Sequence, residues 1–116
     1  MIVTMGIAVQ AQDGVYGRSA AGVRARLEQA DNGRWKAVAE AETDPEGRVR
    51  GWRGRKFDRG VYRLVLDSGR YFVTLGLSAA YSEVALQFRL QDETDSCQIY
   101  ILISPCSYSA YFGALS

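Results

Sequence analysis

The sequence predicts an all-β fold, an antiparallel sandwich of seven or eight short strands with one short helix. Apolar and polar residues alternate in several separate segments, which is the pattern of half-buried strands. Turn sequences such as Asp31-Asn32-Gly33 and Asp44-Pro45-Glu46-Gly47 separate these segments, so neighbouring strands are expected to pair antiparallel. The last twenty residues, 97–116, contain no Asp, Glu, Lys or Arg, although charged residues make up 23% of the chain.

Three strands are expected in the N-terminal part of the chain. In residues 7–13 Ile7, Val9 and Ala11 form an apolar face, whereas Ala8, Gln10 and Gln12 form an amide-rich second face. Residues 23–27 alternate apolar with charged side chains, as in a strand with one face in solvent. A third strand, 34–42, follows the hairpin turn.

The segment 48–63 is strongly basic, since it carries seven of the 14 Lys and Arg residues against one acid. Trp52 and Phe57 are interleaved with the basic residues. The segment could form an anion or nucleic-acid patch. A solvated edge strand and loop is the favoured interpretation, because basic residues also protect sheet edges.

The C-terminal half predicts the remaining elements. Residues 62–66 alternate as a strand, and in 70–78 Tyr71, Phe72 and Leu75 lie at helical spacing, which predicts one short helix. Residues 84–90 alternate again, and a polar loop at 92–96 leads into the uncharged segment.

The uncharged segment predicts two strands, and the first of them has one face in the core and one face pointing outward. Ile99, Ile101 and Ile103 are expected in the core, whereas Gln98, Tyr100 and Leu102 point outward, and a last strand runs near 108–113. A strand face exposed on a monomer should carry charge. A partner subunit or a ligand is therefore expected to cover this face.

Composition excludes several classes of function. The 116 residues are expected to form one domain, 1–116, and a net charge of +1 gives no field for nucleic acid or membrane. Histidine is absent, and no CxxC or nucleotide-binding motif occurs, so neither a metal site nor a cofactor is expected. Cys97 and Cys106 flank an extended strand and are too far apart to bridge, which favours inert thiols and a cytoplasmic location.

Several motifs together resemble the transthyretin and 5-hydroxyisourate hydrolase superfamily. The resemblance covers roughly residues 7 to 114. It is carried by the opening strand with its following loop, by Trp35, and by the spacing of Thr43 and Gly47-Arg48. The matching segments of the C-terminal half are GVYRLVLD at 60–67, LGLS at 75–78 after Tyr71-Phe72, and LISP-x-SYS at 102–109.

The resemblance implies an eight-stranded antiparallel sandwich with one short helix, assembled as a homotetramer that is a dimer of dimers. It also implies a ligand or active site in the channel between dimers. Hydrolases of the superfamily carry a histidine in the first strand, a Gly-Arg pair, a His-x-His and a closing Tyr-Arg-Gly-Ser. Here Gln10 stands at the first histidine, and Ser96 and Gln98 stand at the His-x-His. Arg48 is kept, and the ending reads Tyr111-Phe112-Gly113-Ala114.

This comparison gives a set of candidate site residues. Glutamine cannot take up a proton near neutral pH, so the histidine route of water activation is expected to be lost. In the first hypothesis the chain is an enzyme of altered chemistry that acts on a small polyfunctional molecule by cyclisation, rearrangement or hydrolysis. Arg48, Tyr111, Gln98 and Gln10 are its expected catalytic residues. The expected substrate-binding residues are Gln12, Tyr100, Leu102, Ser109, Phe112 and Gly113. The alternatives are a non-catalytic small-molecule binding protein and a purely structural oligomer.

Overall fold

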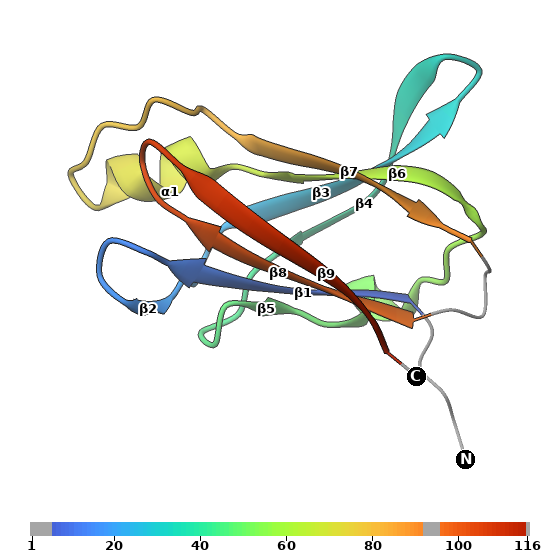
Figure 1. Cartoon of the computed structure of the whole chain (residues 1–116), viewed down its shortest axis with the longest axis horizontal. Coiled ribbons are helices and arrows are strands. Elements are labelled where there is room, and N and C mark those ends of the chain that lie inside the picture. Colours follow the sequence, from blue (N-terminus) through green and yellow to red (C-terminus); the bar gives the residue numbers. More distant parts are fainter. Residues whose placement is uncertain (1–5, 92–95, 116) are drawn as a thin grey trace.

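The computed structural model describes residues 6–91 and 96–115, which form two β-sheets packed face to face with a short helix at one end (Figure 1). One sheet has the strand order β2-β1-β8-β9, with β5 also paired to β1, and the other has the order β4-β3-β6-β7. The strands are β1 (Gly6–Asp13), β2 (Arg18–Ser19), β3 (Arg24–Asp31), β4 (Arg34–Glu42), β5 (Arg48–Val49), β6 (Gly60–Leu66), β7 (Val84–Leu90), β8 (Ser96–Ile103) and β9 (Tyr108–Leu115). A 3-10 turn, η1 (Gly51–Gly54), and the helix α1 (Ser68–Thr74) complete the described elements.

The predicted sandwich with one short helix is confirmed. Of the nine strand segments within the described residues, β2 and β5 span only two residues each, and the seven longer strands lie where the alternation predicted them. The helix α1 begins two residues before the predicted start at 70 and ends at Thr74 instead of 78. It stops there because Gly76 takes a left-handed backbone conformation, with φ of 80°, which ends a helix.

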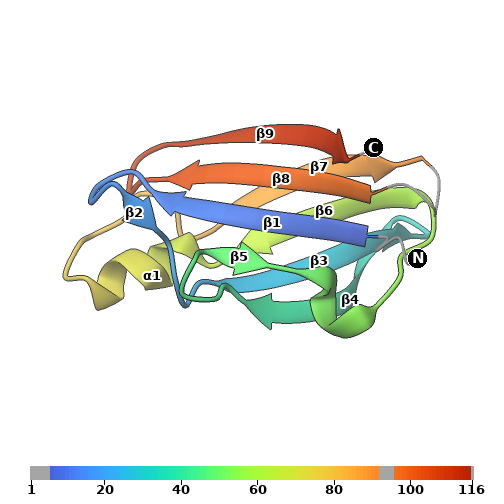
Figure 2. The same cartoon turned by 90° about the horizontal axis from the view of Figure 1, so that it is seen from below.

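One strand pairing differs from the antiparallel prediction. β1 and β8 run parallel, in register from Gly6 opposite Ser96 to Asp13 opposite Ile103. Short turns make consecutive strands antiparallel, but β1 and β8 are far apart in sequence and their relative direction is set by packing. Figure 2 shows the outer face of this sheet, with β1 and β8 side by side between β5 and β9.

The core lies between the two sheets and contains the residues predicted to face inward. Ile99, Ile101 and Ile103 of β8 are at most 2% exposed, and the inward-facing hydrophobic residues of β1, β3 and β6 are equally buried. Trp52 and Phe57 also belong to this core, and the Trp52 Nε1 donates a hydrogen bond of 2.6 Å to the Ile7 carbonyl. Because both rings are buried, neither one can stack on a nucleic-acid base.

The outer face of the second sheet carries an ion-pair cluster formed by Arg26, Glu28 and Arg63. The Glu28 carboxylate accepts hydrogen bonds of 2.7 Å from the Nε atoms of Arg26 and Arg63, and the Arg63 guanidinium lies over the Trp35 ring. Burial alone would raise the pKa of Glu28, but the two arginines outweigh it and hold the pKa below its ordinary value. This cluster therefore stabilises the folded chain at neutral pH.

The predicted loop at 92–96 lies largely outside the described residues, because only Ser96, which begins β8, is described. Near the two ends of β8, Cys97 is buried and Cys106 is exposed. Over the described residues, no helix has both the length and the apolar composition that crossing a membrane requires.

Candidate functional site

The strand registers arrange the predicted site residues in three rows across the outer face of the β1–β8–β9 sheet. The middle row joins Arg48 of β5, Gln10 of β1, Tyr100 of β8 and Tyr111 of β9, each opposite the next. One flanking row contains Ala8, Gln98 and Gly113, and the other contains Gln12, Leu102 and Ser109. Nine of the ten predicted site residues thus lie on one continuous surface, which we call the row face (the residues of these three rows).

The row face is exposed and uncharged except at Arg48. Tyr100, Leu102 and Tyr111 are 46%, 47% and 66% exposed, which is unusual for side chains of this size. The three glutamines are half-buried. A shallow depression of about 200 Å³ lies on this surface, lined by Gln12, Tyr100, Leu102, Ser109 and Tyr111 together with neighbouring β8 and β9 residues. This volume is smaller than that of typical small-molecule sites, about 300–1,000 Å³.

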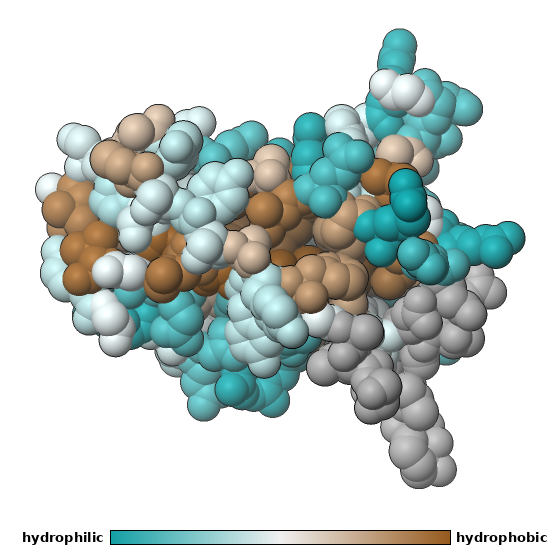
Figure 3. All heavy atoms as spheres, viewed as in Figure 1, coloured by the Kyte–Doolittle hydropathy of each residue, from teal (hydrophilic) through white to brown (hydrophobic). Residues whose placement is uncertain are grey.

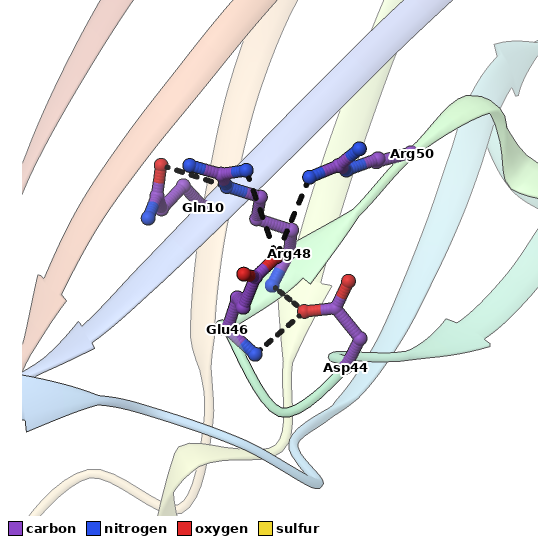
Figure 4. Close-up of polar contacts among 5 residues, drawn as sticks. All are labelled: Gln10, Asp44, Glu46, Arg48 and Arg50. Atoms are coloured by element: carbon purple, nitrogen blue, oxygen red, sulfur yellow. Dashed lines mark hydrogen bonds and ion pairs between the residues drawn. The ribbon is translucent and has the colours of Figure 1, made fainter.

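The turn before β5 positions Arg48 (Figure 4). The Asp44 carboxylate accepts hydrogen bonds from the backbone N–H groups of Glu46, at 2.9 Å, and Arg48, at 2.8 Å. These backbone hydrogen bonds, that from Arg48 first, lower the pKa of Asp44. Gly47 is required in this turn, because its φ is 77° and an added Cβ would lie 2.4 Å from the Ala11 carbonyl oxygen.

Two neighbours share the Arg48 guanidinium, as the dashed lines of Figure 4 show. Its Nε donates a hydrogen bond of 3.4 Å to the Gln10 Oε1, and a terminal nitrogen lies 3.7 Å from the Glu46 carboxylate. Glu46 is also paired with Arg50 at 3.4 Å. The side chain of Arg48 is 40% exposed, so a ligand can compete with these long, solvent-screened contacts.

The two tyrosines form the centre of the row face. The Tyr100 and Tyr111 rings lie 6.2 Å apart with an angle of 41° between their planes. Tyr111 leans over Gly113, where an added Cβ would lie 3.2 Å from the Tyr111 ring. The glycine therefore leaves room for the Tyr111 ring beside Gln98, which pairs with Gly113 across the strands.

Phe112 does not join the row face, and its predicted substrate-binding role stays a prediction. Side chains alternate along a strand, so Phe112 and Tyr111 point to opposite faces of β9. The Phe112 ring contacts Phe88 of β7 with a centroid distance of 5.7 Å, so it faces the edge of the other sheet and is 46% exposed there. Residue spacing already contained this information, because Phe112 is one position out of phase with Ser109, Tyr111 and Gly113.

Sequence reasoning missed the acidic and basic neighbours of Arg48. Asp44, Glu46 and Arg50 determine where its side chain lies and how much of its charge is compensated. The sequence pattern predicts only a turn role for Asp44 and Glu46. Their proximity to Arg48 in the sequence, four residues for Asp44 and two for Glu46, is the available indication.

The row face can hold and orient a ligand, but it provides hydrogen bonds more readily than proton transfer. Its three rows contain amides, phenols, one hydroxyl and one guanidinium, and no Asp, Glu or Lys. Amides donate and accept hydrogen bonds without titrating, and an arginine stabilises negative charge. Among the described residues, no group of three or more Cys, Asp or Glu side chains is arranged to hold a metal ion.

Comparisons with known proteins identify the relatives of this chain. The family model "HIUase/Transthyretin family" matches residues 7–113. A 5-hydroxyisourate hydrolase of Caulobacter vibrioides is 30% identical over 113 residues, which cover 94% of this chain and 98% of that protein. A 5-hydroxyisourate hydrolase 2 of Rhizobium meliloti is 32% identical over 108 residues, covering 88% of this chain and 90% of the relative.

Solved structures share the fold. Transthyretin from Sparus aurata superposes with a TM-score of 0.88 at 24% identity and covers 95% of this chain and 97% of its own. Sea bream transthyretin in complex with thyroxine gives a TM-score of 0.86 at 25% identity, covering 95% and 96% of the two chains. The family match, the hydrolase relatives and the shared sandwich agree: this chain belongs to the HIUase/transthyretin family.

Proposed function

We propose that the chain acts on a small polyfunctional molecule bound at the row face, in a channel completed by another copy of itself. The observation that carries this proposal is the row Arg48–Gln10–Tyr100–Tyr111. It places one cation, one amide and two phenols side by side on a surface that is otherwise uncharged. The reaction would be a cyclisation, rearrangement or hydrolysis that depends on hydrogen bonding and charge stabilisation.

The small size of the depression supports a contribution from a second subunit. A depression of about 200 Å³ that has a wall on one side only is smaller than typical small-molecule sites and leaves a bound molecule open to solvent. The row face of a second subunit, placed opposite the first, would form the other wall of the binding site and exclude water from it. It would also cover Tyr100, Leu102 and Tyr111, whose exposure a free surface does not explain.

The open edge of the sandwich supports the second interface of a dimer of dimers. β7 and β9 are the last strands of their sheets, and the view of Figure 3 shows hydrophobic residues gathered between them. Phe88 and Phe112 contribute to this area, and the edge positions of β7 and β9 leave backbone groups available for pairing. The proposed homotetramer therefore uses the strand edges within each dimer and the row faces between dimers.

In the proposed site each residue has a defined chemical task. Arg48 would bind a carboxylate or an enolate oxygen, and Gln10 and Gln98 would orient carbonyl and N–H groups. Tyr100 or Tyr111 would donate a hydrogen bond to the oxygen on which negative charge develops. Gln12, Leu102, Ser109 and Gly113 would shape the rest of the wall.

We further propose that 5-hydroxyisourate is not the physiological substrate, although relatives carry the name 5-hydroxyisourate hydrolase. By the resemblance, Gln10, Ser96 and Gln98 occupy the positions of the hydrolase histidines. None of the three can act as a general base near neutral pH. The expected location in the cytoplasm stays a prediction from cysteine usage.

Two measurements test this proposal. The decay of freshly prepared 5-hydroxyisourate is followed by absorbance with and without the protein, and we expect no acceleration. A Gln10→His/Gln98→His variant provides the comparison, because a gain in decay rate would show that the face still binds this molecule. Turnover by the unmodified chain at the rate of a hydrolase relative would contradict the altered chemistry.

Assembly is tested by light scattering coupled to gel filtration. We expect a tetramer, and Leu102→Lys, which introduces a charge into the row face, should yield dimers. Arg34→Glu, on the exposed start of β4, is the matched control and should leave the tetramer intact. A stable monomer of the unmodified chain would refute the shared channel.

A non-catalytic binding protein is the second candidate function. The similarity to sea bream transthyretin in complex with thyroxine favours it, because that solved structure holds a small molecule. The row face also carries two aromatic rings and Leu102, which suit an apolar ligand. Saturable binding without product formation, abolished by Tyr111→Lys and retained in Arg34→Glu, would favour this candidate.

A further inference from the structure

A second concave surface lies at the helix end of the sandwich, away from the row face. Figure 2 shows β2, α1 and the turn before β5 gathered at this end. They enclose a groove of about 770 Å³, within the range of small-molecule sites. The groove is lined by Arg18, Ser19, Ala21, Gly22, Arg24, Glu42, Pro45, Asp67, Arg70, Tyr71, Thr74 and Leu75. We call it the arginine groove, and it shares no residue with the row face.

Three arginines from three different elements define the charge of this groove. Arg18 comes from β2, Arg24 from the start of β3 and Arg70 from α1. Within residues 6–91 and 96–115, the guanidinium groups of Arg24 and Arg70 form no ion pair or hydrogen bond, in contrast to those of Arg26, Arg48, Arg50 and Arg63. The fold therefore brings together cations whose charge the described residues do not neutralise by contact.

Arg18 is held in place by its neighbours. Its guanidinium lies 5.1 Å from the centre of the Tyr16 ring. In the same lining, the Tyr71 hydroxyl donates a hydrogen bond of 2.7 Å to the buried Asp13 carboxylate. Both Tyr71 and Asp13 are almost completely buried, so their hydrogen bond fixes this part of the groove wall. A side chain ordered before binding loses less conformational entropy when a ligand arrives.

The remaining lining limits the chemistry of the ligand. Glu42 and Asp67 offset two of the three positive charges, which leaves an excess of one cation. Their carboxylates accept no hydrogen bond from a described side chain, so they can accept hydrogen bonds from a ligand. Ala21, Pro45, Leu75 and the Tyr71 ring add an apolar part to the wall.

We propose that the arginine groove binds a small organic monocarboxylate that also carries a hydrogen-bond donor and an apolar group. The carboxylate would lie among the three guanidinium groups, since arginine binds planar carboxylates with paired N–H donors. The donor would face Glu42 or Asp67, and the apolar part would cover Leu75 and Pro45. A doubly charged phosphate would meet repulsion from the two carboxylates, so it fits this groove less well.

The test uses hippurate as the probe, since it combines one carboxylate, one amide N–H and one aromatic ring. Its neutral amide, hippuramide, has the same shape without the charge. Both are titrated into ¹⁵N-labelled protein, and the backbone amide resonances of Ser19, Gly22 and Leu75 are followed. We expect saturable shifts at these positions with hippurate and at least tenfold weaker binding of hippuramide.

Variants separate the groove from general attraction to a basic surface. Arg24→Gln/Arg70→Gln removes two exposed guanidinium groups, and hippurate should bind about tenfold more weakly, the loss expected for two solvent-exposed charge pairs. The matched control Arg34→Gln removes one exposed charge outside the groove and should bind like the unmodified chain. Unchanged resonances outside the groove show that each variant is folded.

Three outcomes would overturn the proposal: no saturable shift at the groove positions, equal binding of hippuramide, or equal binding by the double variant and Arg34→Gln. Tighter binding of inorganic phosphate than of hippurate would also refute the stated ligand class. Because none of these residues belongs to the row face, failure here leaves the proposed function untouched, and the reverse also holds.

Discussion

Replacing Tyr71 with phenylalanine tests whether the buried Asp13–Tyr71 hydrogen bond secures the helix end of the sandwich. Asp13 is 1% exposed, and its Oδ1 accepts hydrogen bonds from the backbone N–H groups of Val15 and Tyr16 at 2.8 and 3.0 Å. Its Oδ2 accepts the hydrogen bond from the Tyr71 hydroxyl at 2.7 Å. Tyr71→Phe would leave this second oxygen without its protein donor in a buried place.

The magnitude follows from the burial and the charge of the acceptor. Leaving a buried polar atom unsatisfied costs about 1–3 kcal/mol, and hydrogen bonds to charged groups lie in the upper part of this range. We expect the free energy of unfolding to fall by about 2 kcal/mol. For a chain of this length about 1 kcal/mol corresponds to about 4 °C, so the melting temperature should fall by about 8 °C.

The assay is urea unfolding followed by circular dichroism at one fixed protein concentration, because association contributes to apparent stability. Tyr81→Phe is the matched control, since its ring is 44% exposed and its hydroxyl makes no hydrogen bond among the described residues. In an Asp13→Asn background the penalty of Tyr71→Phe should shrink by about 1 kcal/mol, the coupling of residues in contact. Equal midpoints for Tyr71→Phe and Tyr81→Phe would refute the argument.

Three further predictions concern the ion-pair cluster, the core and the Arg48 turn. The folded pKa of Glu28 lies below its ordinary value of 4.5, so its contribution is complete above that pH and is lost as the pH falls through the folded pKa. Unfolding midpoints measured from neutral to acidic pH should therefore converge for the unmodified chain and Glu28→Gln, and parallel curves would contradict this. Ile101→Ala, at a position 1% exposed, should lower the free energy of unfolding by about 2–5 kcal/mol in urea, whereas Leu102→Ala on the exposed face should cost far less in a non-assembled chain. Gly47→Ala should cost about 1–3 kcal/mol through its left-handed backbone and its contact with β1, and a neutral effect on thermal unfolding would show that the turn adapts.

The C-terminal segment illustrates how far the sequence was informative about the site. Alternation of isoleucine with Gln98, Tyr100 and Leu102 separated core from surface, and the structure confirms this division, because the isoleucines are at most 2% exposed. The absence of charge over 97–116 predicted that the outward face is not an ordinary solvent surface. Tyr100, Leu102 and Tyr111 are exposed on this face, and its covering by a partner or a ligand stays a prediction.

The alternation patterns do not predict which residues of other strands lie next to a given residue. Period-two alternation assigns a residue to a face, but it does not say which strand lies beside it or in what register. Gln10 and Tyr100 face each other only because β1 and β8 pair in parallel, and a shift by one residue would place core residues in this row. Alternation does separate Phe112 from Tyr111 and Gly113, because adjacent residues of β9 point to opposite faces of the sheet.

The sequence by itself therefore determined the all-β class, the succession of strands along the chain, the short helix and the faces of β1 and β8, because these depend on local periodicity and turn chemistry. Only the tertiary structure decided the parallel pairing of β1 with β8, the row from Arg48 to Tyr111 and the compensation of Arg48 by Glu46. The same holds for the arginine groove, where β2, β3 and α1 meet at one end of the sandwich. These features are contacts between segments far apart in the chain, or side-chain geometries within a turn, and both result from the packing of the two sheets.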